Sequence, residues 1–130
     1  MRTIQVQKIT EQIKEMCIAV NHELSADMLR RLSEAKKQEK SVNGCQILDQ
    51  LEENLQIARE DRIPICQDTG MAVVFMEIGQ DVHLEGGNLE DAINEGVRQG
   101  YTEGFLRKSV VRDPIDRVNT GDNTPAVIHC

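Results

Sequence analysis

Aromatic residues are nearly absent from this 130-residue chain, which has one Tyr, two Phe and no Trp. Its core must therefore be aliphatic, and it offers little surface on which bases or sugars could stack. Acidic residues outnumber basic ones by 22 to 15, and the resulting net charge of −7 argues against nucleic acid as a partner. The length fits one domain with a modest core, so residues 1–130 are treated as a single domain.

The chain also lacks paired-cysteine motifs and long apolar runs. Its four cysteines are Cys17, Cys45, Cys66 and Cys130, and none lies in C-x-x-C spacing, which excludes a zinc ribbon and a thioredoxin motif. Charged residues within the first 14 positions do not fit a secretory signal, and no segment approaches the ~20 apolar residues that span a bilayer. We therefore expect a cytoplasmic protein with reduced thiols and no membrane partner.

Residues 1–62 are predicted to form a helical region, because apolar residues recur there at intervals of three and four. Ser25 and Ser41 are suited to cap the second and third helices of this region. Cys17 and Cys45 fall among apolar neighbours on the helices, so we expect both in the core.

Residues 63–130 are predicted to form an α/β region with a small mixed sheet. The apolar run 71–78 indicates a largely buried strand, and residues 79–87 indicate a turn or a hairpin with a candidate short strand at 82–84. Further short strands are expected at 109–111 and 126–130. Together with the helical N-terminal region, this pattern predicts the α+β fold class.

A glycine-rich helix is predicted between these strands, capped by Asn88 and running to about Arg107. Gly96, Gly100 and Gly104 recur along one ridge, although each costs about 1 kcal/mol relative to alanine. One interpretation is that the helix is weak or broken near Gly100. The regular spacing favours the other interpretation, a close contact between this ridge and another backbone, and we expect the sheet to pack against this helix.

The three histidines give weaker indications. His22 at a helix end and His83 in the hairpin region are predicted to be solvated. His129 lies in the last expected strand, where an ordinary strand position is favoured over a role as a donor to a site.

A thiol, an amide and a carboxylate stand side by side in the segment Ile63-Pro64-Ile65-Cys66-Gln67-Asp68-Thr69-Gly70. Pro64 ends a preceding helix and Gly70 permits backbone angles that other residues avoid, so the segment is expected to be a tight connection. A thiolate is a soft metal ligand, and a carboxylate can move protons. The alternative that this segment leaves open is a buried cysteine beside a turn-forming aspartate.

Basic and polar residues follow at Arg107, Lys108, Arg112 and the loop 119–124. The planar guanidinium group of arginine binds carboxylates through two hydrogen bonds, so these residues and the thiol fit a metal site for small organic acids. A solvated run of surface charges is one alternative. Simple anion binding by Arg107, Lys108 and the polar loop is another.

Three segments together resemble the class I (iron–sulfur) fumarate hydratases and the alpha subunits of tartrate dehydratases. They are Pro64-Ile65-Cys66-Gln67-Asp68-Thr69-Gly70, Leu106-Arg107-Lys108-Ser109-Val110-Val111 and Asn119-Thr120-Gly121-Asp122-Asn123-Thr124-Pro125-Ala126. Their order and spacing and the helical N-terminal region are also similar, so that the resemblance covers nearly the whole chain. Each motif alone is weak, but the combination is specific to this hydro-lyase family.

The resemblance implies a [4Fe–4S] cluster held by three cysteines, with one open iron that acts as a Lewis acid. It implies reversible hydration of fumarate to malate, or dehydration of tartrate to oxaloacetate. Cys66 would be a cluster ligand and Asp68 a proton carrier, while Arg107 would hold a substrate carboxylate. The substrate-binding residues would be Gln67, Asp68, Arg107, Asp122 and Asn123, of which Asp122 and Asn123 would be supporting groups of the pocket.

Members of this family continue beyond the position that matches Ala126, and the resemblance places two further cluster cysteines there. One thiolate cannot hold a cubane cluster. We therefore expect an N-terminal portion of the catalytic domain, completed by a C-terminal remainder or a beta-type subunit in a homo- or hetero-oligomer. The alternative is a catalytically inactive structural or assembly module that binds no cluster by itself.

Overall fold

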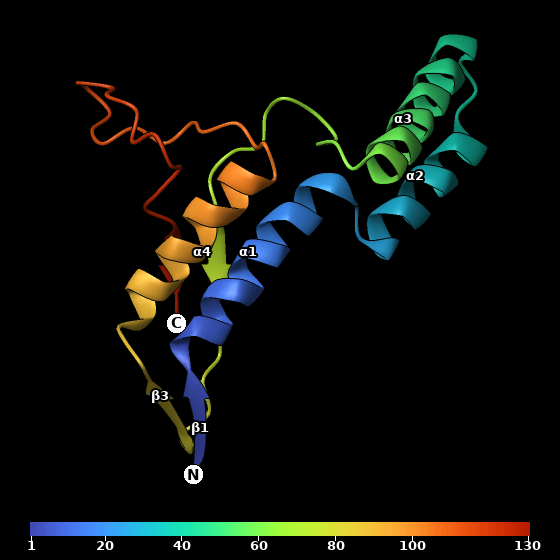
Figure 1. Ribbon diagram of the computed structural model, residues 1–130. Coiled ribbons are helices and arrows are strands. Elements are labelled where there is room, and N and C mark those ends of the chain that lie inside the picture. Colours follow the sequence, from blue (N-terminus) through green and yellow to red (C-terminus); the bar gives the residue numbers. More distant parts are fainter. The chain divides into compact units, whose positions relative to one another are not determined.

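The computed structural model describes all residues 1–130 and contains four helices and four short strands (Figure 1). In chain order they are β1 (Arg2–Gln5), α1 (Val6–His22), α2 (Ala26–Gln38), α3 (Val42–Asp61), β2 (Val73–Phe75), β3 (Val82–Glu85), α4 (Leu89–Glu103) and β4 (Val127–His129). The predicted α+β class is confirmed. None of the helices combines the length and apolar character needed to cross a membrane.

The chain divides into two compact units, which are described separately. The motif unit comprises Met1–Ile18 and Gln67–Cys130, and the helical unit comprises Ala19–Cys66. The motif unit therefore holds most of α1 as well as the segments 67–70, 106–111 and 119–126.

Within the motif unit, α1 and α4 lie against each other along the predicted glycine ridge. A Cβ atom added to Gly96 would lie 2.6 Å from the carbonyl oxygen of Thr10, and one added to Gly100 would lie 2.8 Å from the Cβ of Cys17. The hydroxyl group of Thr10 also donates a hydrogen bond of 2.9 Å to the carbonyl of Ala92. The predicted close contact is confirmed, because side chains on the ridge would hold the two backbones apart.

The core of the motif unit forms around this helix pair. Its most deeply buried apolar side chains are those of Ile93 and Val97, both 0% exposed. Cys17 belongs to the same cluster, as predicted, and its burial raises the pKa of its thiol to about 11. Side chains of the β2–β4 sheet also pack against the cluster, which confirms that a sheet covers the glycine-ridged helix.

The predicted long buried strand is wrong in extent and in burial. Only Val73–Phe75 forms β2, and Val74 is partly buried while Phe75 is 78% exposed. In a strand, alternate side chains point to opposite faces, and only one face of β2 packs on the core. The exposed ring of Phe75 stacks on His129 of β4, with centroids 4.8 Å apart and planes inclined by 13°.

The short strand predicted within residues 79–87 is confirmed, but it does not belong to a hairpin. Residues Val82–Glu85 form β3, which pairs in parallel with β1, a strand that the sequence analysis missed. β2 and β4 form a second parallel pair, so two separate sheets take the place of one mixed sheet. β1 leads directly into α1, and β3 precedes α4, so each strand of the first pair is followed by one helix of the packed pair (Figure 1).

The segments near the C-terminal end of α4 also differ from the prediction. The helix ends at Glu103, with Gly104 as its C-cap, instead of continuing to Arg107. The strand predicted at 109–111 is reduced to one antiparallel bridge between Val111 and Asn119.

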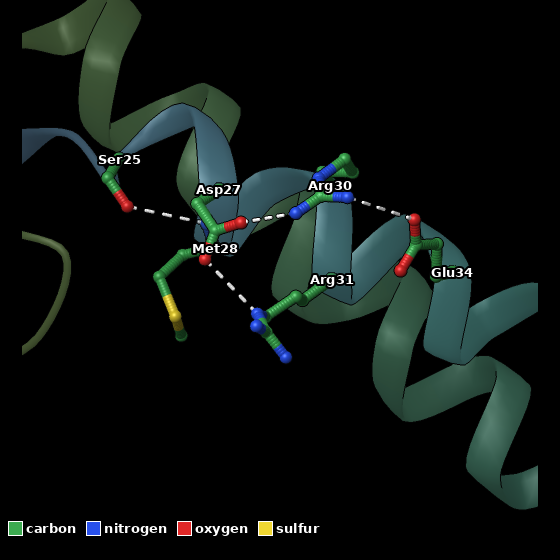
Figure 2. A network of polar contacts seen from close by, with 6 residues as sticks. All are labelled: Ser25, Asp27, Met28, Arg30, Arg31 and Glu34. Atoms are coloured by element: carbon green, nitrogen blue, oxygen red, sulfur yellow. Dashed lines mark hydrogen bonds and ion pairs between the residues drawn. The ribbon is translucent and has the colours of Figure 1, made fainter.

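In the helical unit, the predicted caps are confirmed. The hydroxyl oxygens of Ser25 and Ser41 accept hydrogen bonds of 3.3 Å from the backbone amides of Met28 and Gly44. Figure 2 shows the Ser25 cap at the start of α2 together with an exposed network on that helix. In this network, Asp27 contacts Arg30 at 2.5 Å and Arg31 at 3.1 Å, and these hydrogen bonds lower the pKa of the Asp27 carboxyl.

Ion pairs connect α2 to α3 in the helical unit. The ammonium group of Lys36 lies 2.6 Å from a carboxylate oxygen of Asp49 and 2.6 Å from one of Glu52. These hydrogen bonds raise the pKa of Lys36 above its ordinary value. No residue of α2 is buried.

Two predictions for side chains of the helical unit had different outcomes. His22 was predicted to be solvated, but it is only 8% exposed, so this prediction is wrong. His22 is the last residue of α1, and its side chain is enclosed there. Cys45 was predicted to lie in the core, but it is only half-buried, and its thiol donates to the carbonyl of Glu39 at 3.7 Å.

Candidate functional site

The three sequence motifs meet within the motif unit at the side chain of Asn123, which is 0% exposed. Its Oδ1 atom accepts hydrogen bonds from the backbone N–H groups of Ser109 at 2.6 Å and Val110 at 3.0 Å. Its Nδ2 atom donates to the carbonyl of Gly70 at 3.0 Å. One buried amide thus connects the third motif with both the second and the first.

A second set of contacts fixes the loop that carries Gln67 and Asp68. The hydroxyl group of Tyr101, from α4, donates to the carbonyl of Thr69 at 3.0 Å and contacts that of Gly70 at 3.4 Å. The hydroxyl group of Thr69 donates to the carbonyl of Arg107 at 3.1 Å. The side chain of Thr69, the residue next to Asp68, is therefore bonded to the backbone of Arg107.

The polar loop 119–124 folds back onto the second motif. The side-chain amide of Asn119 donates to the carbonyl of Lys108 at 2.9 Å. The backbone amide of Thr120 donates to the carbonyl of Val110 at 3.0 Å. The loop is therefore held to the segment that carries Arg107 by its own backbone and side chains.

Asp122 lies within this loop as a stabilised carboxylate. Its Oδ1 atom accepts hydrogen bonds from the backbone amide of Thr124 at 3.0 Å and from the hydroxyl of the same residue at 2.7 Å. Burial alone would raise the pKa of Asp122, but these bonds, a bond from Thr120 and the charge of Arg98 outweigh it and lower the pKa. The side chain is therefore ionised at neutral pH and acts as an acceptor.

The side chains predicted to bind substrate are presented on this scaffold. Gln67, Asp68 and Arg107 are all exposed, whereas Asn123 is buried and Asp122 is partly buried. An amide, a carboxylate and a guanidinium group are thus accessible on backbone segments that hydrogen bonds hold together. Such a set can bind a carboxylate and exchange a proton with the same ligand.

Cys66 is the last residue of the helical unit, directly before Gln67 in the chain. It is exposed and forms no disulfide. The residue before it is fixed, because the N–H of Ile65 donates to the carbonyl of Asn21 at 2.9 Å and its own carbonyl accepts from the side chain of Asn54 at 2.9 Å. An accessible thiol on an anchored segment suits a metal ligand.

The other three cysteines have different surroundings from Cys66. Cys17 is buried and its pKa is raised, and Cys45 lies on α3 with its thiol directed to a carbonyl. Cys130 is exposed just after β4. No group of three or more His, Cys, Asp or Glu side chains that could hold a metal ion is present. The exposed thiol of Cys66 therefore fits one ligand of an iron–sulfur cluster.

Tyr101 was missed by the sequence reasoning as a residue of this site. It is the only tyrosine of the chain, it follows Gly100 on the glycine-ridged helix, and it is 3% exposed. A buried tyrosine hydroxyl requires a hydrogen-bond partner, so a tyrosine on the buried ridge was the available signal.

Comparison with known proteins agrees with the motifs. Residues 10–130 match the family described as fumarate hydratase (Fumerase). This chain belongs to that family. The predicted membership is thereby confirmed for the fumarate hydratase (Fumerase) family over nearly the whole chain.

Two curated relatives show how much of such a protein the chain represents. The putative L(+)-tartrate dehydratase subunit alpha of Methanocaldococcus jannaschii is 34% identical over 125 residues, which cover 92% of this chain and 44% of that protein. The L(+)-tartrate dehydratase subunit alpha of Escherichia coli K12 is 30% identical over 119 residues, which cover 92% of this chain and 39% of that protein. The chain thus spans about two-fifths of the length of these relatives.

Proposed function

We propose that this member of the fumarate hydratase family contributes to a hydro-lyase that interconverts fumarate and malate or dehydrates tartrate to oxaloacetate. The single observation that carries the proposal is the meeting of the three motifs at the buried side chain of Asn123. This arrangement supports a common site, because the exposed groups of Gln67, Asp68 and Arg107 stand on segments that are bonded to one another. The family membership and the names of the relatives support the same reaction class.

We assign the following roles to the residues of this chain. Arg107 binds one carboxylate of a small dicarboxylate substrate through its guanidinium group. Asp68 takes a proton from the substrate carbon during dehydration and returns it during hydration. Gln67 and Asp122 orient the substrate, and Asn123 supports the pocket through its hydrogen bonds to the backbone of the motifs.

The proposed cofactor is a [4Fe–4S] cluster, to which Cys66 supplies one thiolate. When bound, the cluster supplies an open iron that acts as a Lewis acid toward substrate oxygens. The remaining ligands are proposed to come from outside residues 1–130, either from a C-terminal remainder or from a beta-type subunit. The assignment of residues 1–130 to one N-terminal part of the catalytic domain stays a prediction.

The proposal can be tested on the product of the complete gene, purified without oxygen together with any subunit that accompanies it. We expect conversion of fumarate, malate or tartrate. Asp68→Asn should lower kcat on the order of 10²- to 10⁴-fold, as loss of a general acid–base does, and Arg107→Lys should raise KM. Arg117→Lys, an exposed arginine of the same unit, is the matched control and should leave both constants unchanged. A cluster-loaded protein that acts on none of the three compounds would contradict the proposal.

A second candidate function is an inactive structural or assembly module. It is favoured by the absence of any three-residue metal-binding group within the chain. Iron and sulfide analysis of the 130-residue chain after reconstitution separates the two. A stoichiometric cluster bound by this chain alone would contradict the module.

A further inference from the structure

We propose that Asn123 and Tyr101 are positioning residues that hold Gln67 and Asp68 at a fixed separation from Arg107. Neither side chain need touch substrate, because both are buried and both direct polar atoms to the backbone of the motifs. This inference deepens the proposed function and rests on it, since it assumes that these exposed groups act on one substrate.

The carbonyl of Gly70 is the point at which the two residues meet. It accepts a hydrogen bond of 3.0 Å from Asn123, and the hydroxyl of Tyr101 lies at 3.4 Å. Gly70 has a φ of +61°, a conformation that side chains disfavour, although there is open space where a Cβ would lie. The glycine at position 70 is therefore explained by the conformation of the turn, which brings this carbonyl to the two buried donors. Crowding does not explain it.

The backbone of Asn123 is also in an uncommon conformation, with a φ of +65°. Asparagine tolerates the left-handed region better than most residues, but such a conformation persists only where its surroundings favour it. Here the buried side-chain amide of Asn123 forms hydrogen bonds with three backbone groups. Its loss would leave one buried N–H group, that of Val110, and two partly buried groups, the N–H of Ser109 and the C=O of Gly70, without these partners, which is more costly than the loss of an exposed hydrogen bond.

The contacts lie close along the chain to the groups that would react. Thr69 follows Asp68, and its hydroxyl is bonded to the carbonyl of Arg107 itself. Ser109 lies two residues after Arg107 and is held by Asn123 at 2.6 Å. Release of either anchor would shift the carboxylate relative to the guanidinium group, and small errors in the position of reacting groups strongly reduce rates.

The test compares Asn123→Ala and Tyr101→Phe in the complete gene product with its cluster. Tyr101→Phe keeps the packing of the ring and removes only the hydroxyl. The matched control is Asn94→Ala, because Asn94 is a partly buried asparagine of the same unit whose side chain accepts a 2.9 Å hydrogen bond from the backbone amide of Ala126. Three quantities are measured: kcat/KM, iron and sulfide per chain, and hydrogen exchange of peptides that cover residues 67–72 and 107–111.

We expect kcat/KM to fall on the order of 10- to 100-fold in Asn123→Ala and about tenfold in Tyr101→Phe, with unchanged iron and sulfide. Exchange should become faster in both peptides. Asn94→Ala should lower Tm yet leave kcat/KM and exchange in these peptides close to those of the parent.

Unchanged exchange in Asn123→Ala, or a loss of kcat/KM no greater than that of Asn94→Ala, would overturn the positioning role while leaving an active parent enzyme. An inactive parent with a full cluster would instead contradict the proposed function, so the two failures are distinguishable.

Discussion

The motif unit and the helical unit are held together in different ways. The motif unit encloses Ile93, Val97 and Asn123 completely, and its loops are bonded to one another from inside. In the helical unit, α2 has no buried residue and Ala58 is the only one of α3. The groups proposed to bind substrate thus stand on the unit with the tighter interior, as a site that must hold its geometry requires.

The contacts of the helical unit are mostly at its surface. Large apolar side chains such as Leu29, Leu51 and Ile57 are each 43–45% exposed. Ion pairs such as those of Lys36 join its helices, and exposed pairs contribute little to stability. The two units should therefore respond differently to equivalent substitutions.

The largest difference is expected for a pair of isoleucines. Ile93→Ala should destabilise the motif unit by about 2–5 kcal/mol, because it leaves a cavity beside Val97. Tyr101 is the only tyrosine and the chain has no Trp, so intrinsic fluorescence during urea unfolding of the 130-residue chain reports the motif unit alone.

The matched substitution in the helical unit is Ile57→Ala. Ile57 is 43% exposed, so the change in stability should stay below about 1 kcal/mol when unfolding is followed by far-UV circular dichroism. Equal losses of unfolding free energy in Ile93→Ala and Ile57→Ala would refute the contrast between the units.

The next largest effect is a pH dependence confined to the motif unit. Burial raises the pKa of Cys17 to about 11 from its ordinary 9.0, so the folded state favours the neutral thiol. Below pH 9 the thiol is protonated in both states, and above it the unfolded chain loses its proton first. The contribution of Cys17 to the free energy of unfolding should therefore fall between pH 9 and 11, by about 2 kcal/mol at pH 11.

Unfolding of the parent and of Cys17→Ala should be compared across this pH range by circular dichroism. The variant is expected to be less stable at pH 8 but to lose less stability on titration. Parallel curves for the two proteins would show that Cys17 is not the group responsible.

A smaller effect is expected where α1 and α4 touch. Gly96→Ala introduces a Cβ 2.6 Å from the carbonyl of Thr10. Overpacking costs typically 1–3 kcal/mol, of which about 1 kcal/mol is offset by the helix propensity of alanine, so a net loss of about 1 kcal/mol is expected. Gly79→Ala is the control, since nothing lies within 4 Å of its added Cβ, and a gain of stability in Gly96→Ala would contradict close packing.

The smallest effect is expected on the exposed network of α2. Asp27→Asn removes the charge that pairs with Arg30 and Arg31, which should slightly reduce helix content at low salt. The difference should vanish near 1 M NaCl, where the screening length is about 3 Å. A difference in circular dichroism that persists in high salt would mean that the network does more than an exposed ion pair.

The features that the sequence predicted correctly depend on nearby residues. Ser25, Ser41 and Asn88 cap helices through contacts two or three residues away, and such signals are local. The glycine ridge was predictable as a contact surface because three glycines in a helix have a clear cost. Its partner, α1, was not identified, because spacing within one helix does not indicate what lies opposite.

The features that were missed join distant parts of the chain. β1 and β3 pair although Arg2 and Val82 are far apart in sequence, and the short run Val82–Glu85 is equally compatible with a local hairpin. Likewise, the motifs suggested that Asn123 supports a pocket, but not that it bonds to Gly70, 53 residues away. Local patterns thus indicated the chemical groups of the site, and long-range packing decided how they are held.

The most direct test of the account measures iron and acid-labile sulfide in Cys66→Ala of the complete gene product, beside Cys130→Ala. Both cysteines are exposed, but only Cys66 is proposed to bind the cluster. We predict that Cys66→Ala loses the cluster and the hydro-lyase activity while circular dichroism shows a preserved fold, and that Cys130→Ala keeps both. A Cys66→Ala protein that retains full iron, sulfide and activity would contradict the account.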